Sequence, residues 1–170
     1  MDYLNRAQAP FPAEIWAKLD GAAVEAARER LSARRFLPVE GPYGIGLTAI
    51  ECGNDEVYRQ PRPSEAAAVL SRTQPVPMIR QVFRLSIRRI AAATEHGQPL
   101  DLAPVEDAAE AVADREEELV YRGERDMNLQ GLTTSDGHLE VATGDWGELT
   151  RALDDVLAAA TRLDEHGYRG

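Results

Sequence analysis

The first regular pattern of apolar positions begins after Pro12 and repeats with a mixed three- and four-residue step, which predicts a helix with one apolar side. Gly21 lies inside this pattern and costs about 1 kcal/mol relative to alanine, so a bend or break there is allowed. Pro38, Gly41 and Pro42 prevent the helix from continuing. The predicted stripe comprises Ile15, Trp16, Leu19, Ala23, Ala26, Ala27, Arg30 and Leu31.

Strand patterns follow on both sides of a proline-rich excursion. Residues 47–50 predict a short strand, and the string Gly53-Asn54-Asp55 predicts a turn after it. Residues 79–87 alternate in polarity, which predicts a second strand with one buried face. The predicted buried face holds Ile79, Phe83, Leu85 and Ile87, and the opposite face holds Arg80, Arg84 and Ser86.

The segment between these strands, residues 48–78, fits either of two structures. One is an extended hairpin that stands away from the domain, and the other is a long flexible loop. A projecting hairpin buries little of itself and is expected to pack on a neighbouring molecule, because exposed strand edges otherwise promote aggregation.

A short helix is predicted around residues 88–94, ended by Gly97 and Pro99. The clearest helix of the chain starts at Asp101 and Pro104 and ends at Arg122 with Gly123. Its stripe contains one charged residue, Glu116, which either pairs with an arginine or lies where the stripe meets solvent; the second arrangement is the commoner. The full stripe is Val105, Ala109, Val112, Glu116 and Leu119.

The last part of the chain combines strand-like pieces with one helix. Residues 129–141 predict short strands with a turn at Ser135-Asp136-Gly137. Asp145 is expected to cap the following helix, with Glu148 completing a capping box, and Gly167 is expected to end it. The apolar face of this helix is Leu149, Leu153, Val156, Ala160 and Leu163. A further strand would normally follow, so the sequence is expected to stop in mid-domain.

Composition narrows the functional classes. The 170 residues suffice for a packed core, and no apolar run is long enough for a membrane span. A net charge of −10, from 29 acidic and 19 basic residues, disfavours nonspecific nucleic-acid binding. Cys52 is the only cysteine, which excludes an intrachain disulfide and suits a reducing cytoplasm. Nearly all the positive charge is arginine, a residue favoured in packed interfaces, although genome composition also produces such a bias.

Candidate catalytic groups do not form a site in the sequence. His96, His138 and His166 each lie beside a turn glycine and have no metal-ligand spacing, so they are interpreted as exposed turn residues. The long helix is dense in acids, three of them consecutive, and consecutive positions radiate around the helix axis and do not converge, so a solvated face is favoured over acid–base or metal chemistry. These acids are Glu110, Asp114, Glu116, Glu117 and Glu118.

The glycines at Gly41, Gly44 and Gly46 lack the lysine and hydroxyl residue of a phosphate-binding loop and precede a strand instead of a helix. No serine lies in a nucleophile-elbow context. The sequence therefore predicts no enzyme, and no metal or cofactor.

Several strings in order resemble the family-one encapsulins, also described as linocin-like bacteriocins, over essentially the whole chain. The opening Met1-Asp2-Tyr3-Leu4 with Trp16 is one such string, and Arg34-Arg35-Phe36 followed by Val39-Glu40-Gly41-Pro42-Tyr43-Gly44 is the most specific. The others are Asp101-Leu102, Leu119 with Tyr121-Arg122-Gly123, Gly131-Leu132 and Gly167-Tyr168-Arg169-Gly170.

This resemblance implies an α+β, phage-capsid-like fold of the Hong Kong 97 type. Residues 1–47 and 79–127 would form a peripheral domain, with the N-terminal helix facing the lumen and a long spine helix. Residues 48–78 would form the extended loop, and residues 128–170 would start an axial domain whose remainder is absent from this chain. The chain would then be truncated, split or proteolysed, with a separate chain carrying the missing part as one alternative.

The resemblance also implies a shell subunit that self-assembles into an icosahedral homo-oligomer in the cytoplasm. The shell would enclose a cargo enzyme, a dye-decolourising peroxidase or a ferritin-like protein, which docks through a C-terminal loading peptide. The alternatives are an enzyme of the bacteriocin or protease type and a phage major capsid protein. No nucleic-acid or membrane partner is expected.

Four residues match the peptide-binding positions of the family: Ala23, Ala27, Leu31 and Arg34. Small residues on a helix would leave a shallow groove, and Arg34 could meet a peptide carbonyl or carboxylate, although the same residues would also suit a core. Two departures are visible. Pro38 replaces an aspartate found in many relatives, and Arg88 replaces an aromatic residue linked to flavin in some, so flavin is not expected.

Overall fold

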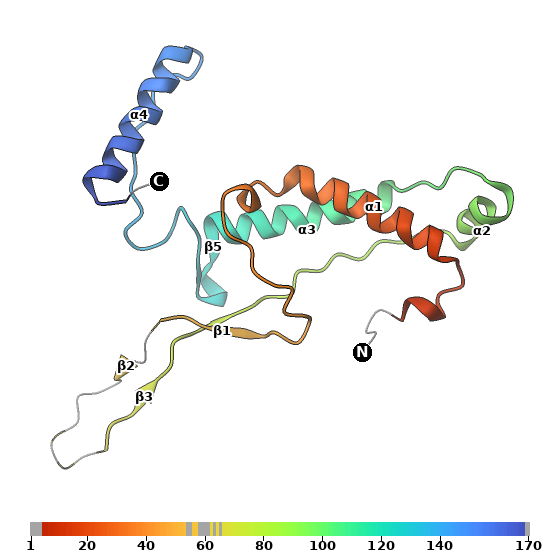
Figure 1. Ribbon diagram of the computed structural model, residues 1–170, viewed down its shortest axis with the longest axis horizontal. Helices are drawn as coiled ribbons and strands as arrows, with labels where there is room; N and C mark the ends of the chain where they lie inside the picture. The colour runs from red at the N-terminus through yellow and green to blue at the C-terminus, as the bar shows by residue number, and fades with distance from the viewer. Residues whose placement is uncertain (1–4, 54–55, 58–61, 63, 65, 169–170) are drawn as a thin grey trace. The chain divides into compact units, whose positions relative to one another are not determined.

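The computed structural model describes residues 5–53, 56–57, 62, 64 and 66–168, and it divides into two compact units, residues 1–131 and 132–170. The described chain mixes helices with short strands (Figure 1), in agreement with the α+β prediction. The first unit contains the helices α1 (Ala13–Arg30), α2 (Ile87–His96) and α3 (Ala103–Arg122), with short 3₁₀ turns η1 (Arg6–Gln8), η2 (Ala33–Arg35) and η3 (Arg125–Met127).

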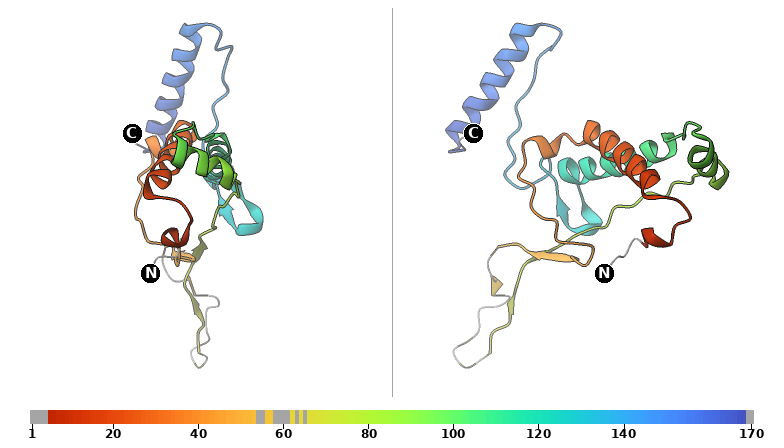
Figure 2. Two further views of the ribbon diagram at one scale, coloured as in Figure 1. Left: turned by 90° about the vertical axis from the view of Figure 1, so that its right-hand side faces the viewer. Right: turned by 45° about the vertical axis from the view of Figure 1, so that its right-hand side comes forward.

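The core of the first unit lies where α1, α2 and α3 meet. Figures 1 and 2 show α1 and α3 side by side, running in the same direction. Ile15 and Leu19 of α1 cluster with Ile90 of α2 and Val105 of α3, all four buried. Burying an aliphatic side chain contributes about 1.5–3 kcal/mol relative to exposure, so this cluster stabilises the packing of the three helices. Half-buried Phe11, Trp16, Ala23, Leu85, Ala93, Leu100 and Leu102 pack around it.

The three predicted helices of this unit form with nearly the predicted bounds. α1 is one uninterrupted helix, so Gly21 causes no break. Ala22, outside the predicted stripe, is buried as well. The Asp101 side chain accepts a 3.1 Å hydrogen bond from the Ala103 amide at the start of α3, and the left-handed Gly97 ends α2. These helix ends confirm the start and stop signals in the sequence.

A ladder of paired strands forms the arm, defined as residues 48–78. β1 (Ala49–Glu51) pairs antiparallel with β4 (Thr73–Pro75), and β2 (Glu56–Val57) pairs with β3 (Val69–Leu70). The hairpin prediction is therefore correct, and the Cys52 amide extends the ladder by donating to the Arg72 carbonyl at 2.8 Å. The turn predicted at Gly53-Asn54-Asp55 includes two positions outside the described residues.

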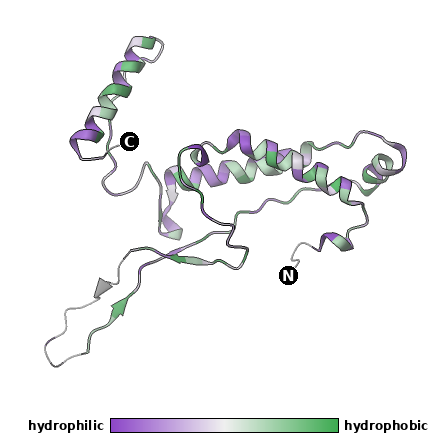
Figure 3. Ribbon diagram, in the orientation of Figure 1, coloured by the Kyte–Doolittle hydropathy of each residue, from purple (hydrophilic) through white to green (hydrophobic). Residues whose placement is uncertain are grey.

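The described residues of the arm form no core of their own. Strands β1 and β3 carry hydrophobic residues (Figure 3), yet every described side chain on them is exposed. The exposed large apolar side chains of the described arm residues are Ile50, Val69, Leu70, Val76 and Met78. Two strands without a covered face are marginally stable in water, so these side chains favour a partner surface.

The strand predicted over residues 79–87 is wrong. Residues 79–86 form no ladder with any described strand, and α2 already begins at Ile87. Strand β4 takes the place next to β1 instead, at residues 73–75. The alternation reflects an extended connection that turns Leu85 toward the core cluster while Val82 stays 79% exposed.

After α3 the chain folds back in a tight hairpin of β5 (Gly123–Glu124) and β6 (Leu129–Gln130). Gly123 has a positive φ of 72°, and the Leu129 carbonyl oxygen would lie 2.2 Å from a Cβ at that position. Only glycine permits this approach. Of the strands predicted over residues 129–141, β6 alone forms, while the predicted turn at Gly137 is present with φ of 85°.

The second unit consists of a loop and α4 (Leu149–Glu165). The loop is held by Asp155, which accepts hydrogen bonds from the Gly144 amide at 2.7 Å and from Trp146 Nε1 at 2.9 Å. Gly167 ends the helix as predicted, because its amide and that of Tyr168 donate to the Asp164 and Leu163 carbonyls.

The predicted capping box is wrong. Asp145 accepts a hydrogen bond from the Gly147 amide at 2.9 Å instead of capping the helix. The N-cap residue is Glu148, whose side chain makes no capping hydrogen bond. The predicted apolar face of α4 is exposed in this unit, with Leu149 at 77%. No described helix in either unit is long and apolar enough to span a bilayer.

Candidate functional site

A groove of about 630 Å³ lies along the C-terminal half of α1 and the turn η2. Helical spacing explains this lining. Positions 24, 27, 28 and 31 follow one another at three- and four-residue intervals, which places them on one face of α1 and its C-cap. Two arginines of η2 extend the lining beyond the end of α1. The residues lining the groove are Val24, Ala27, Arg28, Leu31, Arg34 and Arg35.

The groove contains most of the predicted peptide-binding set. Ala27, Leu31 and Arg34 line it together. Ala23 does not; it is half-buried and packs against the core cluster. Sequence reasoning missed Val24, Arg28 and Arg35, although the three- and four-residue spacing from Ala27 and Leu31 was a signal for the first two.

Arg34 is held by a bidentate ion pair across the interface between η2 and α3. Its Nε donates to Glu116 Oε1 at 2.6 Å, and its Nη2 donates to Glu116 Oε2 at 2.7 Å. The pair raises the pKa of Arg34 further, chiefly through the hydrogen bond to Glu116. Of the two arrangements considered for Glu116, the arginine pair is present, and it fixes the guanidinium at the rim of the groove.

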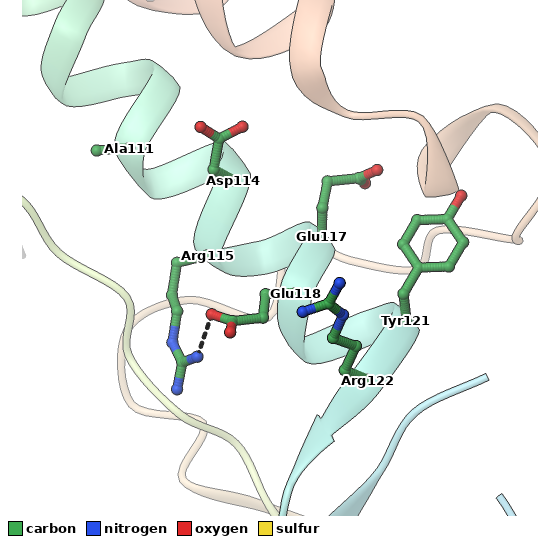
Figure 4. Close-up of a pocket in the computed structure, with 7 residues that line it drawn as sticks. All are labelled: Ala111, Asp114, Arg115, Glu117, Glu118, Tyr121 and Arg122. Carbon is green, nitrogen blue, oxygen red and sulfur yellow. Dashed lines mark hydrogen bonds and ion pairs between the residues drawn. The ribbon is translucent and has the colours of Figure 1, made fainter. Parts of the chain in front are cut away.

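Glu117 anchors the backbone of the same turn. Its carboxylate accepts hydrogen bonds from the Ala33 amide, at 3.0 Å, and from the Ser32 hydroxyl. Ser32 Oγ also lies 2.9 Å from the Tyr121 hydroxyl. Figure 4 shows Glu117 and Tyr121 extending from α3 on the side of this segment. Burial acts to raise the pKa of Glu117, but the hydrogen bonds from Ser32 and Ala33 outweigh it and hold the pKa below 4.5.

The acidic residues of α3 are all at least partly exposed, as expected for a solvated face, and they also serve as an attachment surface. Glu110 pairs with Arg30 at the end of α1, with Asp114 4.0 Å from the same guanidinium. Glu118 pairs with Arg115 (Figure 4). Arg115 also contacts Glu124 at 2.9 Å. The carboxylates are distributed around the helix and still find partners, from α1 for Glu110, from Ser32 and η2 for Glu116 and Glu117, and from α3 itself for Glu118.

The remaining arginines of the groove, Arg28 and Arg35, are exposed and have no ion pair among the described residues. Arg35 acts on Glu117 only at a distance, as one of the charges that lower its pKa. The groove thus combines an apolar lining with two uncompensated guanidinium groups.

The described residues include no cluster of metal-ligating side chains. His96, His138 and His166 all lie at exposed positions beside turns or helix ends, as predicted. The pKa of His138 is raised by the Ser135 carbonyl and by Glu140, contacts typical of a surface histidine. Arginine, aliphatic and alanine side chains supply no nucleophile with a base, so the groove is equipped for binding and not for bond cleavage.

Comparison with known proteins gives a consistent result. The model of the family described as encapsulating protein for peroxidase matches residues 1–170. The chain is 29% identical over 177 aligned positions to the type 1 encapsulin shell protein EncA of Myxococcus xanthus, covering 99% of this chain and 62% of that protein. It is 30% identical over 141 positions to a type 1 encapsulin shell protein of Rhodococcus erythropolis, covering 83% of this chain and 53% of the relative.

A third relative is a diheme-cytochrome-encapsulin shell fusion protein of Kuenenia stuttgartiensis, 27% identical over 167 positions that cover 92% of this chain and 45% of that protein. This chain therefore spans between 45% and 62% of the length of these three relatives.

Proposed function

Since this chain belongs to the encapsulin shell-protein family, we propose that it is a structural subunit of an icosahedral shell that encloses a cargo enzyme. The observation that carries the proposal is the family match over residues 1–170, joined to a groove without catalytic groups. The role is structural and not catalytic, and the shell lies in the bacterial cytoplasm.

The proposed fold is the Hong Kong 97 type of capsid fold. Residues 1–47 and 79–127 correspond to the peripheral domain, with α3 as its spine helix, and residues 128–170 to the start of the axial domain. The arm is the extended loop, and in the shell it packs on neighbouring subunits. Its exposed apolar side chains, among them Val69 and Leu70, support this assignment because they have no covering partner among the described residues.

We assign the groove beside α1 to the C-terminal loading peptide of the cargo. Ala27 and Leu31 provide an apolar surface for an extended peptide, and Arg34 lies at the rim as a donor with N–H groups left after its pair with Glu116. Ala23 is not part of this assignment, because it packs against the core cluster. The cargo is a dye-decolourising peroxidase or a ferritin-like protein.

Electron microscopy of the full gene product, purified from its native host, tests this function. Closed particles of uniform diameter that release a second protein on denaturation are the expected result. A small discrete species without particles, seen at every protein concentration tried, would exclude a shell. Deleting the last residues of the co-purified protein should leave intact but empty particles.

A further inference from the structure

The side chains that line the groove divide into two chemical groups. Val24, Ala27 and Leu31 are apolar, and the other three are arginines. No acidic residue is among the described residues that line it. A peptide in this groove therefore meets aliphatic surface and guanidinium groups and no carboxylate of the lining.

The three arginines are not equivalent. Both carboxylate oxygens of Glu116 accept hydrogen bonds from Arg34, so the charge of this guanidinium is compensated. Arg28 and Arg35 are exposed and have no ion pair among the described residues, so their charges are left for a ligand. This pair of cations stands out on a chain whose net charge is −10.

We propose that the groove selects a peptide that carries acidic side chains beside its apolar residues, and that Arg28 and Arg35 are the residues that select it. This inference rests on the proposed function of the groove as a peptide site. Charge complementarity at a partly exposed site contributes modestly to affinity and strongly to discrimination, because a like charge is repelled.

Acidic side chains are favoured over a terminal carboxylate as the source of the negative charge. Arg28 belongs to α1 and Arg35 to η2, seven positions further along the chain. One terminal carboxylate at the end of a peptide engages one such group, whereas acidic side chains spaced along the peptide reach both. Amidation of the peptide terminus should therefore leave binding nearly unchanged.

Fluorescence anisotropy on the full chain tests the inference with labelled peptides that share their apolar positions and differ at two sites. These sites hold aspartate, asparagine or lysine, and each peptide is prepared with a free and an amidated terminus. The aspartate peptide should bind about two- to fivefold more tightly per ion pair than the asparagine peptide, and the lysine peptide more weakly than both. Raising the salt concentration should reduce these differences.

Charge reversal separates selection from a loss of folding. The double variant Arg28→Glu with Arg35→Glu should prefer the lysine peptide, a gain that an unfolded chain cannot produce. Its helical circular dichroism should match that of the wild type, since both side chains are exposed.

The outcomes distinguish this inference from the proposed function. If all three peptides bind equally, or if the double variant keeps the wild-type order, the selection by Arg28 and Arg35 is wrong while the peptide groove remains. A strong effect of terminal amidation would overturn the choice of acidic side chains. If none of the peptides binds at millimolar concentration, the groove is not a peptide site. The assignment of the groove to a loading peptide and the selection by Arg28 and Arg35 then both fail.

Discussion

Gly131 packs directly against Gly123, so that a Cβ on Gly131 would lie 2.4 Å from the Gly123 amide nitrogen and 2.4 Å from the Arg122 carbonyl carbon. These are backbone atoms at the end of α3 and cannot rotate away. The two glycines, eight positions apart in the chain, make the close hairpin of β5 and β6 possible.

Gly131→Ala should therefore destabilise the chain by about 4 kcal/mol or more, because the hairpin must separate from the end of α3. Gly21→Ala is the matched control: a Cβ there meets nothing within 4 Å, and α1 gains about 1 kcal/mol of helix propensity. Urea unfolding followed by circular dichroism measures both. Equal effects of the two substitutions would contradict the close packing.

The core cluster predicts a contrast between two aliphatic truncations. Leu19→Ala removes a side chain that is 4% exposed and packs with Ile15, Ile90 and Val105. The expected cost is about 2–5 kcal/mol of unfolding free energy. Val82→Ala, at a side chain 79% exposed, should cost less than about 0.5 kcal/mol. A similar midpoint shift in urea for both variants would show that the core lies elsewhere.

The pair between Arg34 and Glu116 should appear as a coupling in a double-mutant cycle. With side chains 50% and 27% exposed, the pair is partly screened by water, and a coupling of about 0.5–1 kcal/mol is expected. The cycle uses Arg34→Gln, Glu116→Gln and the double variant in urea unfolding. Strictly additive effects would mean that the ion pair makes no contribution in solution.

The lowered pKa of Glu117 predicts a pH-dependent attachment of η2 to α3. A carboxylate whose pKa is lower in the folded than in the unfolded chain stabilises the fold above the ordinary value of 4.5, and this contribution is lost as the pH falls through the folded pKa. Glu117→Gln should lower stability at neutral pH and flatten its decline below about pH 4.5. Glu25→Gln, at an exposed position of α1, is the control. An unchanged pH profile in Glu117→Gln would refute the role of this carboxylate.

Helix ends could be predicted from the sequence because their signals are local. Asp101 forms the turn that starts α3. Gly97 and Gly167 end α2 and α4 with a positive φ, which glycine adopts without strain. Asp145 followed the same rule and failed, because a competing hydrogen bond to the nearby Gly147 amide was also available to its side chain.

Partners distant in sequence could not be predicted. Glu117 lies 84 positions after Ala33, and its carboxylate accepts a hydrogen bond from the Ala33 amide. Nothing in the sequence around either residue indicates that contact. The strand expected at residues 79–87 failed for a related reason, since alternation records which side chains face the interior and not whether a partner strand exists. For the groove, the apolar residues Ala27 and Leu31 were accessible to sequence reasoning, while the attachment of Arg34 to Glu116 required the structure.

The residues that attach η2 to the protein are distinct from those that line the groove, with Arg34 as the single member of both sets. Substitutions at Val24, Arg28 or Arg35 can therefore change what the groove accepts without loosening the turn that shapes it. If the groove holds a loading peptide as proposed, such a site is evolvable: a descendant could acquire a new guest by exchanging a few exposed side chains. The same separation would then allow the groove to be redesigned for a chosen enzyme.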